Sequence, residues 1–69
     1  MNTSESKAEI AYQKKELYVL YPKLSFLDIK NTINGVIAEF REMDIDKAKY
    51  KKNIRPKEFE MFKKRMGIL

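Results

Sequence analysis

The sequence contains no cysteine and no histidine among its 69 residues, and these two absences exclude several classes of function. Without cysteine the chain cannot form a disulfide, a thiolate nucleophile, an iron–sulfur cluster or a cysteine-bound zinc site. Without histidine it lacks the commonest general base near neutral pH and the commonest transition-metal ligand. We therefore predict that the protein is not an enzyme and that it uses no cofactor.

Long apolar runs are missing as well. The longest, Leu17-Tyr18-Val19-Leu20-Tyr21, is far shorter than the roughly 20 residues that span a bilayer. The first five residues also lack the basic-then-apolar pattern of a secretion signal. We expect no membrane partner and an intracellular location, in the cytoplasm, nucleoid or nucleus.

Glycine and proline are scarce, with two of each, so little interrupts helix formation. The hydrophobic content of 43% is sufficient for a core, while the length allows one domain at most. We predict an all-α fold, a small bundle of three to four helices. Residues 1–5 are expected to be disordered and residues 6–69 to form the single helical domain.

The first predicted helix begins at a capping box, Ser6-x-x-Glu9, and runs to about Leu20, because Pro22 disfavours helical geometry at the residue before it. The second begins at Ser25-x-x-Asp28. Its apolar residues recur at steps of three and four, which is typical of a helix buried along one face: Phe26, Ile29, Ile33, Val36, Ile37, Phe40 and Met43.

Gly35 lies in the middle of this second helix, where glycine costs about 1 kcal/mol relative to alanine. Either another helix approaches closely at this point, or the glycine is a tolerated imperfection.

Two further helices are predicted in the C-terminal part. Asp44 is placed to cap a short third helix that includes Ala48 and extends to about Tyr50. Pro56 suits the first position of a fourth helix, and Gly67 suits its end. The apolar face of the fourth helix consists of Phe59, Phe62 and Met66. Alternatively, Pro56 is a kink, and the third and fourth helices are one bent helix.

Positive charge is concentrated in the C-terminal third. Residues 1–46 have six basic and eight acidic side chains, whereas residues 47–69 have nine basic and two acidic ones. In the segment 47–59 the basic residues alternate with apolar ones, and helical turns would place the apolar side chains inward and the cations outward. Such an array suits the phosphates of a nucleic-acid backbone.

We therefore predict a small accessory protein that binds nucleic acid with low sequence specificity, with DNA as the leading candidate. The predicted binding residues are Lys47, Lys49, Lys51, Lys52, Arg55, Lys57, Lys63, Lys64, Arg65 and Phe26. Three alternatives remain open. In the first, the cations form only a solvated surface. In the second, they dock on an acidic protein surface, as an interaction module or small inhibitor does. In the third, the apolar second helix supports a homodimer.

Phe26 follows a predicted N-cap, where side chains are often partly exposed, so it could insert into a partner or make only a local contact. The neighbouring carboxylates Asp44 and Asp46 raise the possibility of a divalent-metal site. Lys47 and Lys49 stand where a calcium loop would need oxygen ligands and a glycine, so helix capping is the better interpretation and no metal is predicted.

Two segments resemble the HMG-box family. They are Tyr21-Pro22-Lys23-Leu24-Ser25-Phe26-Leu27-Asp28-Ile29, which fits the turn into that family's second helix, and Asp46-Lys47-Ala48-Lys49-Tyr50, which fits the start of its third. The resemblance covers residues 10–55 and implies minor-groove binding by a concave basic face, with Phe26 between base steps. The sequence departs from the family pattern in lacking tryptophan and in having Pro56 where the third helix would continue.

Overall fold

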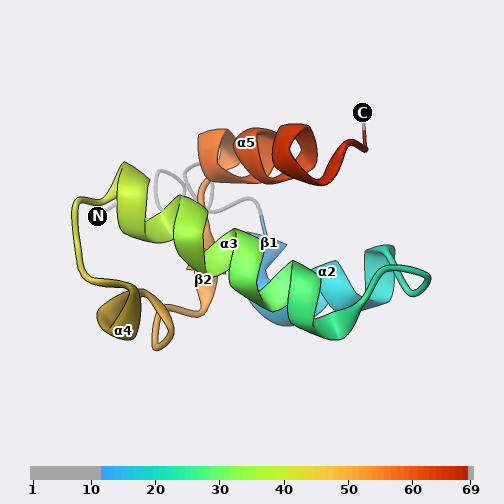
Figure 1. The fold of residues 1–69 in the computed structure, drawn as a ribbon, viewed down its shortest axis with the longest axis horizontal. Coiled ribbons are helices and arrows are strands. Elements are labelled where there is room, and N and C mark those ends of the chain that lie inside the picture. Colours follow the sequence, from blue (N-terminus) through green and yellow to red (C-terminus); the bar gives the residue numbers. More distant parts are fainter. Residues whose placement is uncertain (1–11, 69) are drawn as a thin grey trace, which may run out of the picture.

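The computed structural model describes residues 12–68, which form four helices and one short antiparallel strand pair (Figure 1). The predicted mostly helical fold is confirmed, and the strand pair is an addition to it. In chain order the elements are β1 (Tyr12–Gln13), α2 (Lys14–Leu20), α3 (Phe26–Phe40), α4 (Ile45–Ala48), β2 (Asn53–Ile54) and α5 (Pro56–Met66).

Helix α3 is the centre of the fold, and α2, α4 and α5 all pack against it. It begins as predicted, because the Ser25 hydroxyl accepts a hydrogen bond from the Asp28 backbone N–H at 3.4 Å. It ends at Phe40, earlier than the expected Met43, and Glu42 adopts a left-handed conformation at φ 54° in the turn that follows. These three helices cover the middle of α3, where the apolar residues Ile29, Ile33, Val36 and Ile37 are buried.

The first predicted helix is wrong in part. Tyr12 and Gln13 are strand residues that pair with Ile54 and Asn53, and the helix begins only at Lys14. Helical turns satisfy backbone groups locally, but here the Lys14 backbone N–H donates to the carbonyl oxygen of Lys52 at 2.8 Å, which continues the strand pairing. The predicted Ser6-x-x-Glu9 start and the expected disorder of residues 1–5 lie outside the described residues.

The C-terminal helices begin where the sequence indicates. Asp44 occupies the N-cap position of α4, although its side chain makes no capping hydrogen bond. Helix α5 has Pro56 as its first residue and ends at Gly67, whose φ of 78° is the left-handed conformation that glycine adopts easily. The loop and strand between Ala48 and Pro56 show that the bent-helix alternative is wrong. The segment matched to the start of an HMG-box third helix forms α4 and the turn after it.

The core contains eight buried apolar residues from every helix and from β2: Leu17, Ile29, Ile33, Val36, Ile37, Ala48, Ile54 and Phe62. The apolar faces expected from the sequence are longer than the buried core, and the residues at their ends lie outside it. Leu20, Phe26 and Phe40 are exposed, because each is the first or last residue of its helix and lies past the neighbours that cover the middle.

One ion pair is buried beside this core. Glu58 is 1% exposed, and its two carboxylate oxygens accept hydrogen bonds from Nε and Nη2 of Arg41, both at 2.8 Å. The Arg55 backbone N–H also donates to Glu58, at 2.9 Å, and Arg41 Nη2 donates to the Asn53 carbonyl oxygen at 2.9 Å. The pair therefore joins the end of α3 to β2 and to the start of α5.

Gly35 has no close neighbour. A methyl group at its Cβ position would meet no atom within 4 Å, apart from its own helical surroundings. Of the two alternatives for this position, the close helix approach is therefore wrong and the tolerated imperfection holds. Within residues 12–68, no helix combines the length and the apolar character that crossing a membrane requires.

Candidate nucleic-acid interface

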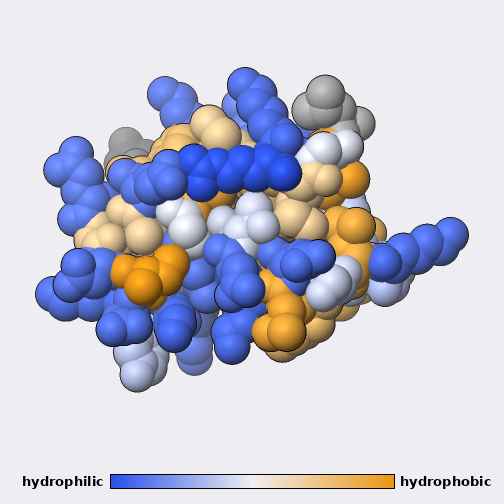
Figure 2. Space-filling view, viewed as in Figure 1, coloured by the Kyte–Doolittle hydropathy of each residue, from blue (hydrophilic) through white to orange (hydrophobic). Residues whose placement is uncertain are grey.

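The structure divides the C-terminal cations into two groups. Lys57, Lys63, Lys64 and Arg65 belong to α5, on one side of α3, while α4 and the loop after it lie on the other side (Figure 1). Figure 2 accordingly shows hydrophilic side chains along both of these edges. The expected continuous fan of cations on helical turns is wrong, because the chain leaves helical geometry after Ala48 and enters β2 at Asn53.

Two of the four α5 cations, Lys63 and Arg65, are engaged with other groups of the protein. Arg65 forms an ion pair with Glu39 of α3 at 2.5 Å, and this hydrogen bond lowers the pKa of Glu39. The Lys63 ammonium lies over the Phe59 ring, 4.9 Å from its centroid, in a cation–π contact. Lys57 and Lys64 are exposed. Arg55 is exposed at the N-cap of α5, between the two groups.

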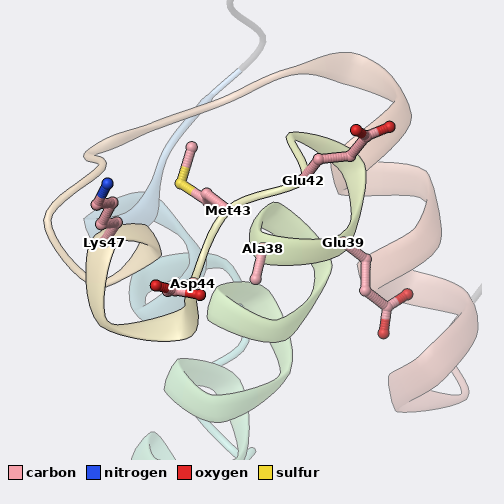
Figure 3. Close-up of a pocket in the computed structure, with 6 residues that line it drawn as sticks. All are labelled: Ala38, Glu39, Glu42, Met43, Asp44 and Lys47. Atoms are coloured by element: carbon pink, nitrogen blue, oxygen red, sulfur yellow. The ribbon is translucent and has the colours of Figure 1, made fainter.

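Lys47 lies in an acidic setting. It lines a hollow of about 460 Å³ together with Glu39, Glu42 and Asp44, and Figure 3 shows Lys47 and Asp44 on the same side of this hollow. Glu39 is on the opposite side, turned toward α5 (Figure 3). The negative charges around Lys47 oppose the binding of a phosphate, so Lys47 is less suited to this role than the other cations of its segment.

A second hollow, of about 530 Å³, has the opposite character. We call it the lysine groove, and its lining residues are Gln13, Lys14, Lys15, Tyr18, Lys49, Lys51 and Lys52. None of these described lining residues is acidic. Two of its lysines come from α2 and three from the loop that follows α4, so residues that are far apart in the sequence surround one concave surface.

Lys14 differs from the other lysines of the groove because its ammonium group is tied to the protein. It donates hydrogen bonds to the Asn34 side-chain oxygen, to the Ala48 carbonyl oxygen at 2.8 Å and to the Lys49 carbonyl oxygen at 3.3 Å. Burial, and secondarily the charge of Arg41, lower the pKa of Lys14. Lys14 therefore fixes the loop in place, while the exposed Lys15, Lys49, Lys51 and Lys52 remain available to a ligand.

Lys49 has one acidic neighbour, Asp46, at 3.8 Å between Lys49 Nζ and the carboxylate. Both side chains are well exposed, so this pair is weak and easily exchanged for another anion.

Aromatic side chains stand beside the groove. Tyr18 lines it, and the Phe26 ring stacks on Tyr18 with 4.5 Å between ring centroids. Phe26 is still 59% exposed, so it makes the local contact and retains an open face. Burial raises the pKa of the Tyr18 hydroxyl.

Tyr50 corrects the prediction for the third helix, which placed it on the inner face. Its side chain is 84% exposed, because the chain turns after α4 and the Tyr50 N–H bonds to the Lys47 carbonyl oxygen at 3.1 Å. In the chain it lies between two groove lysines, Lys49 and Lys51, although it does not itself line the groove.

Sequence reasoning missed Lys15 and Tyr18 as members of this surface. Both precede the basic C-terminal third, and a count of charge by segment gives them no weight. The only local sign of a basic surface in this region is the pair Lys14-Lys15 at the start of α2. This pair comes close to Lys52 only because β1 and β2 are paired.

No group of three or more acidic side chains within residues 12–68 is arranged to hold a metal ion. Asp46 contacts Lys49, and Asp44 occupies the N-cap position of α4 without a capping hydrogen bond from its side chain, so the predicted side-chain capping by Asp44 is not formed.

Comparison with known proteins gives no relative for this chain. No protein-family model matches it, and neither does any curated protein or solved structure. The resemblance to HMG boxes stays a prediction.

Proposed function

We propose that the lysine groove binds the phosphate backbone of a nucleic acid. The observation that supports this most strongly is the gathering of Lys15, Lys49, Lys51 and Lys52, all exposed, around one concave surface whose described lining has no acidic residue. Ammonium groups that surround a hollow attract a chain of phosphates more strongly than the same charges dispersed over a surface.

The proposed contacts are directed to phosphates and not to base edges. Lysine is a flexible point charge, and contacts of this kind position a nucleic acid without reading its sequence. Binding should therefore show low sequence specificity and a steep dependence on salt, since each neutralised phosphate releases counterions. The cations of α5 have a smaller role in this proposal, because Arg65 and Lys63 are already engaged within the protein.

The test compares two variants with the same loss of charge. The groove variant carries Lys15→Gln, Lys51→Gln and Lys52→Gln, and the control variant carries Lys23→Gln, Lys57→Gln and Lys64→Gln at exposed positions outside the groove. Affinities for duplex and single-stranded DNA and for RNA are measured by fluorescence anisotropy at salt concentrations from about 50 to 200 mM.

We expect the groove variant to lose roughly an order of magnitude or more in affinity, with the salt slope reduced by about 2 to 3 for three lost contacts. The control variant should lose much less. Equal losses in the two variants would show that net charge, and not the groove, attracts the ligand. Failure of the wild-type protein to bind any of these nucleic acids at low salt would overturn the proposal and favour an acidic protein surface as the partner.

A further inference from the structure

We propose that the ligand of the lysine groove is a single strand, one of whose bases stacks on the ring of Tyr50. This inference rests on the proposed function and specifies the form of nucleic acid that the site takes. It is based on three observations: the exposure of Tyr50, the lysines on either side of it, and the way in which the backbone of its loop is held.

Tyr50 is the most exposed of the large apolar side chains in the described part of the chain, at 84%. Aromatic rings in a small domain normally contribute to the core, as Phe62 does here with complete burial. Within residues 12–68 the Tyr50 ring stacks on no other aromatic ring. The ring is therefore largely open to a flat partner from outside the protein.

The loop that presents Tyr50 is held at several points. Lys14 Nζ donates to the carbonyl oxygens of Ala48 and Lys49, and the Lys14 backbone N–H donates to that of Lys52 at 2.8 Å. The Lys51 N–H closes the turn on the Ala48 carbonyl oxygen at 3.0 Å. Little backbone ordering remains to be done when a ligand binds, which favours affinity.

The neighbours of Tyr50 determine which partner fits. Tyr50 is not itself a lining residue of the groove, but the residues directly before and after it in the chain, Lys49 and Lys51, are. A strand whose phosphates meet these two lysines therefore passes close to the exposed ring. In a duplex the base faces are stacked on one another and closed to an aromatic side chain. A single strand offers both its phosphates and its base faces, the combination that aromatic and basic surfaces of single-strand-binding proteins engage.

The experiment separates stacking from charge by removing the bases and not the phosphates. Wild-type protein is titrated, at low salt, with oligo-dT of about 12 nucleotides, with an abasic strand of the same length, and with a duplex of that length. The Tyr50→Ser and Tyr50→Phe variants are titrated in the same way. Circular dichroism of each variant checks that the helical fold is retained, as expected for a side chain that packs so little.

We expect the wild-type protein to bind oligo-dT roughly tenfold more tightly than the abasic strand. Tyr50→Ser should lower the affinity for oligo-dT by about the same factor and leave the affinity for the abasic strand unchanged. Tyr50→Phe, which keeps the ring, should behave like the wild type.

Equal wild-type affinities for oligo-dT and the abasic strand would overturn stacking while leaving phosphate binding by the groove intact. The same conclusion would follow if Tyr50→Ser weakened both strands equally, or if the duplex bound more tightly than oligo-dT. No binding of any of the three ligands would instead overturn the proposed function, and the inference with it.

Discussion

The side-chain ammonium of Lys14 donates a hydrogen bond of 2.8 Å to the backbone carbonyl oxygen of Ala48. This contact joins the first turn of α2 to the last residue of α4, and Lys14 Nζ continues to the carbonyl oxygen of Lys49 and to the side chain of the buried Asn34. A residue that adds positive charge to the groove thus also determines the shape of the groove.

Lys14 and the adjacent Lys15 should respond differently to the same substitution. Lys14→Met removes three hydrogen bonds and leaves the buried Asn34 oxygen without its donor, so we expect a loss of about 1–3 kcal/mol in the free energy of unfolding. Lys15→Met, at an exposed position, should change it by less than about 0.5 kcal/mol. Urea unfolding followed by circular dichroism measures both, and similar losses would contradict the structural role of Lys14.

Two glutamates with arginine partners provide a second comparison. Glu58→Gln leaves the largely buried Arg41 without its counter-charge and should cost about 3–5 kcal/mol in stability. Glu39→Gln removes the surface pair with Arg65, and little change is expected. A double variant, Arg41→Met with Glu58→Met, should be less destabilised than Glu58→Gln alone, because no unpaired charge remains. Calorimetric melting of the three proteins would contradict this reasoning if Glu39→Gln caused the largest loss.

Glu58 should also make the stability of the protein depend on pH in the acidic range. Burial by itself raises the pKa of Glu58, but hydrogen bonds from Arg41 and the Arg55 backbone, with the charges of both arginines, outweigh it and leave the pKa below its usual value. A lowered folded pKa stabilises the protein fully above the unfolded value of about 4.3, and this contribution is lost as the pH falls from there through the folded pKa. We expect the melting temperature to fall in that window. A carbon-13 NMR titration of the Glu58 carboxyl with a midpoint at or above the ordinary value would refute the assignment.

Replacing each of the two glycines with alanine should change the stability of the protein in opposite directions. Gly35→Ala adds a methyl group that meets no neighbour in the middle of α3, so unfolding should cost about 0.5–1 kcal/mol more. Gly67→Ala forces a side chain into the left-handed conformation at the end of α5, and about 1 kcal/mol of stability should be lost. Chemical denaturation tests both changes, and stabilisation by Gly67→Ala would show that α5 ends in another way.

Local sequence signals account for most of the helices. Ser25 and Asp28 define the start of α3, Pro56 the start of α5 and Gly67 its end, because each acts on the backbone within one turn of its own position. The apolar spacing also identified the buried Ile29, Ile33, Val36 and Ile37. It could not show which ends of α3 the neighbouring helices leave exposed.

The strand pair and the groove depend on contacts between distant residues, and this is why the sequence did not reveal them. Tyr12 and Gln13 continue an apparent helical pattern, yet their backbone groups pair with β2, which turns α2 toward the loop after α4. The concentration of charge in residues 47–69 drew attention to Lys49, Lys51 and Lys52, which line the groove. The charge distribution along the sequence could not show that the cations of α5 lie on the other side of α3. Nor could it show that Lys15 lines the same groove as the lysines of the loop after α4.

The lysine groove forms only in the folded protein, because the pairing of Tyr12 with Ile54 brings α2 beside the loop after α4. A peptide that contains only one of these segments therefore cannot reproduce it. A synthetic fragment copying residues 47–57 would keep six of the basic side chains but lose the opposing wall and the ammonium anchor that holds its turn. Such a fragment would attract polyanions as any oligolysine does. Recognition that depends on the shape of the groove would require β1 to pair with β2, and we expect it to be lost together with the helices when the protein unfolds.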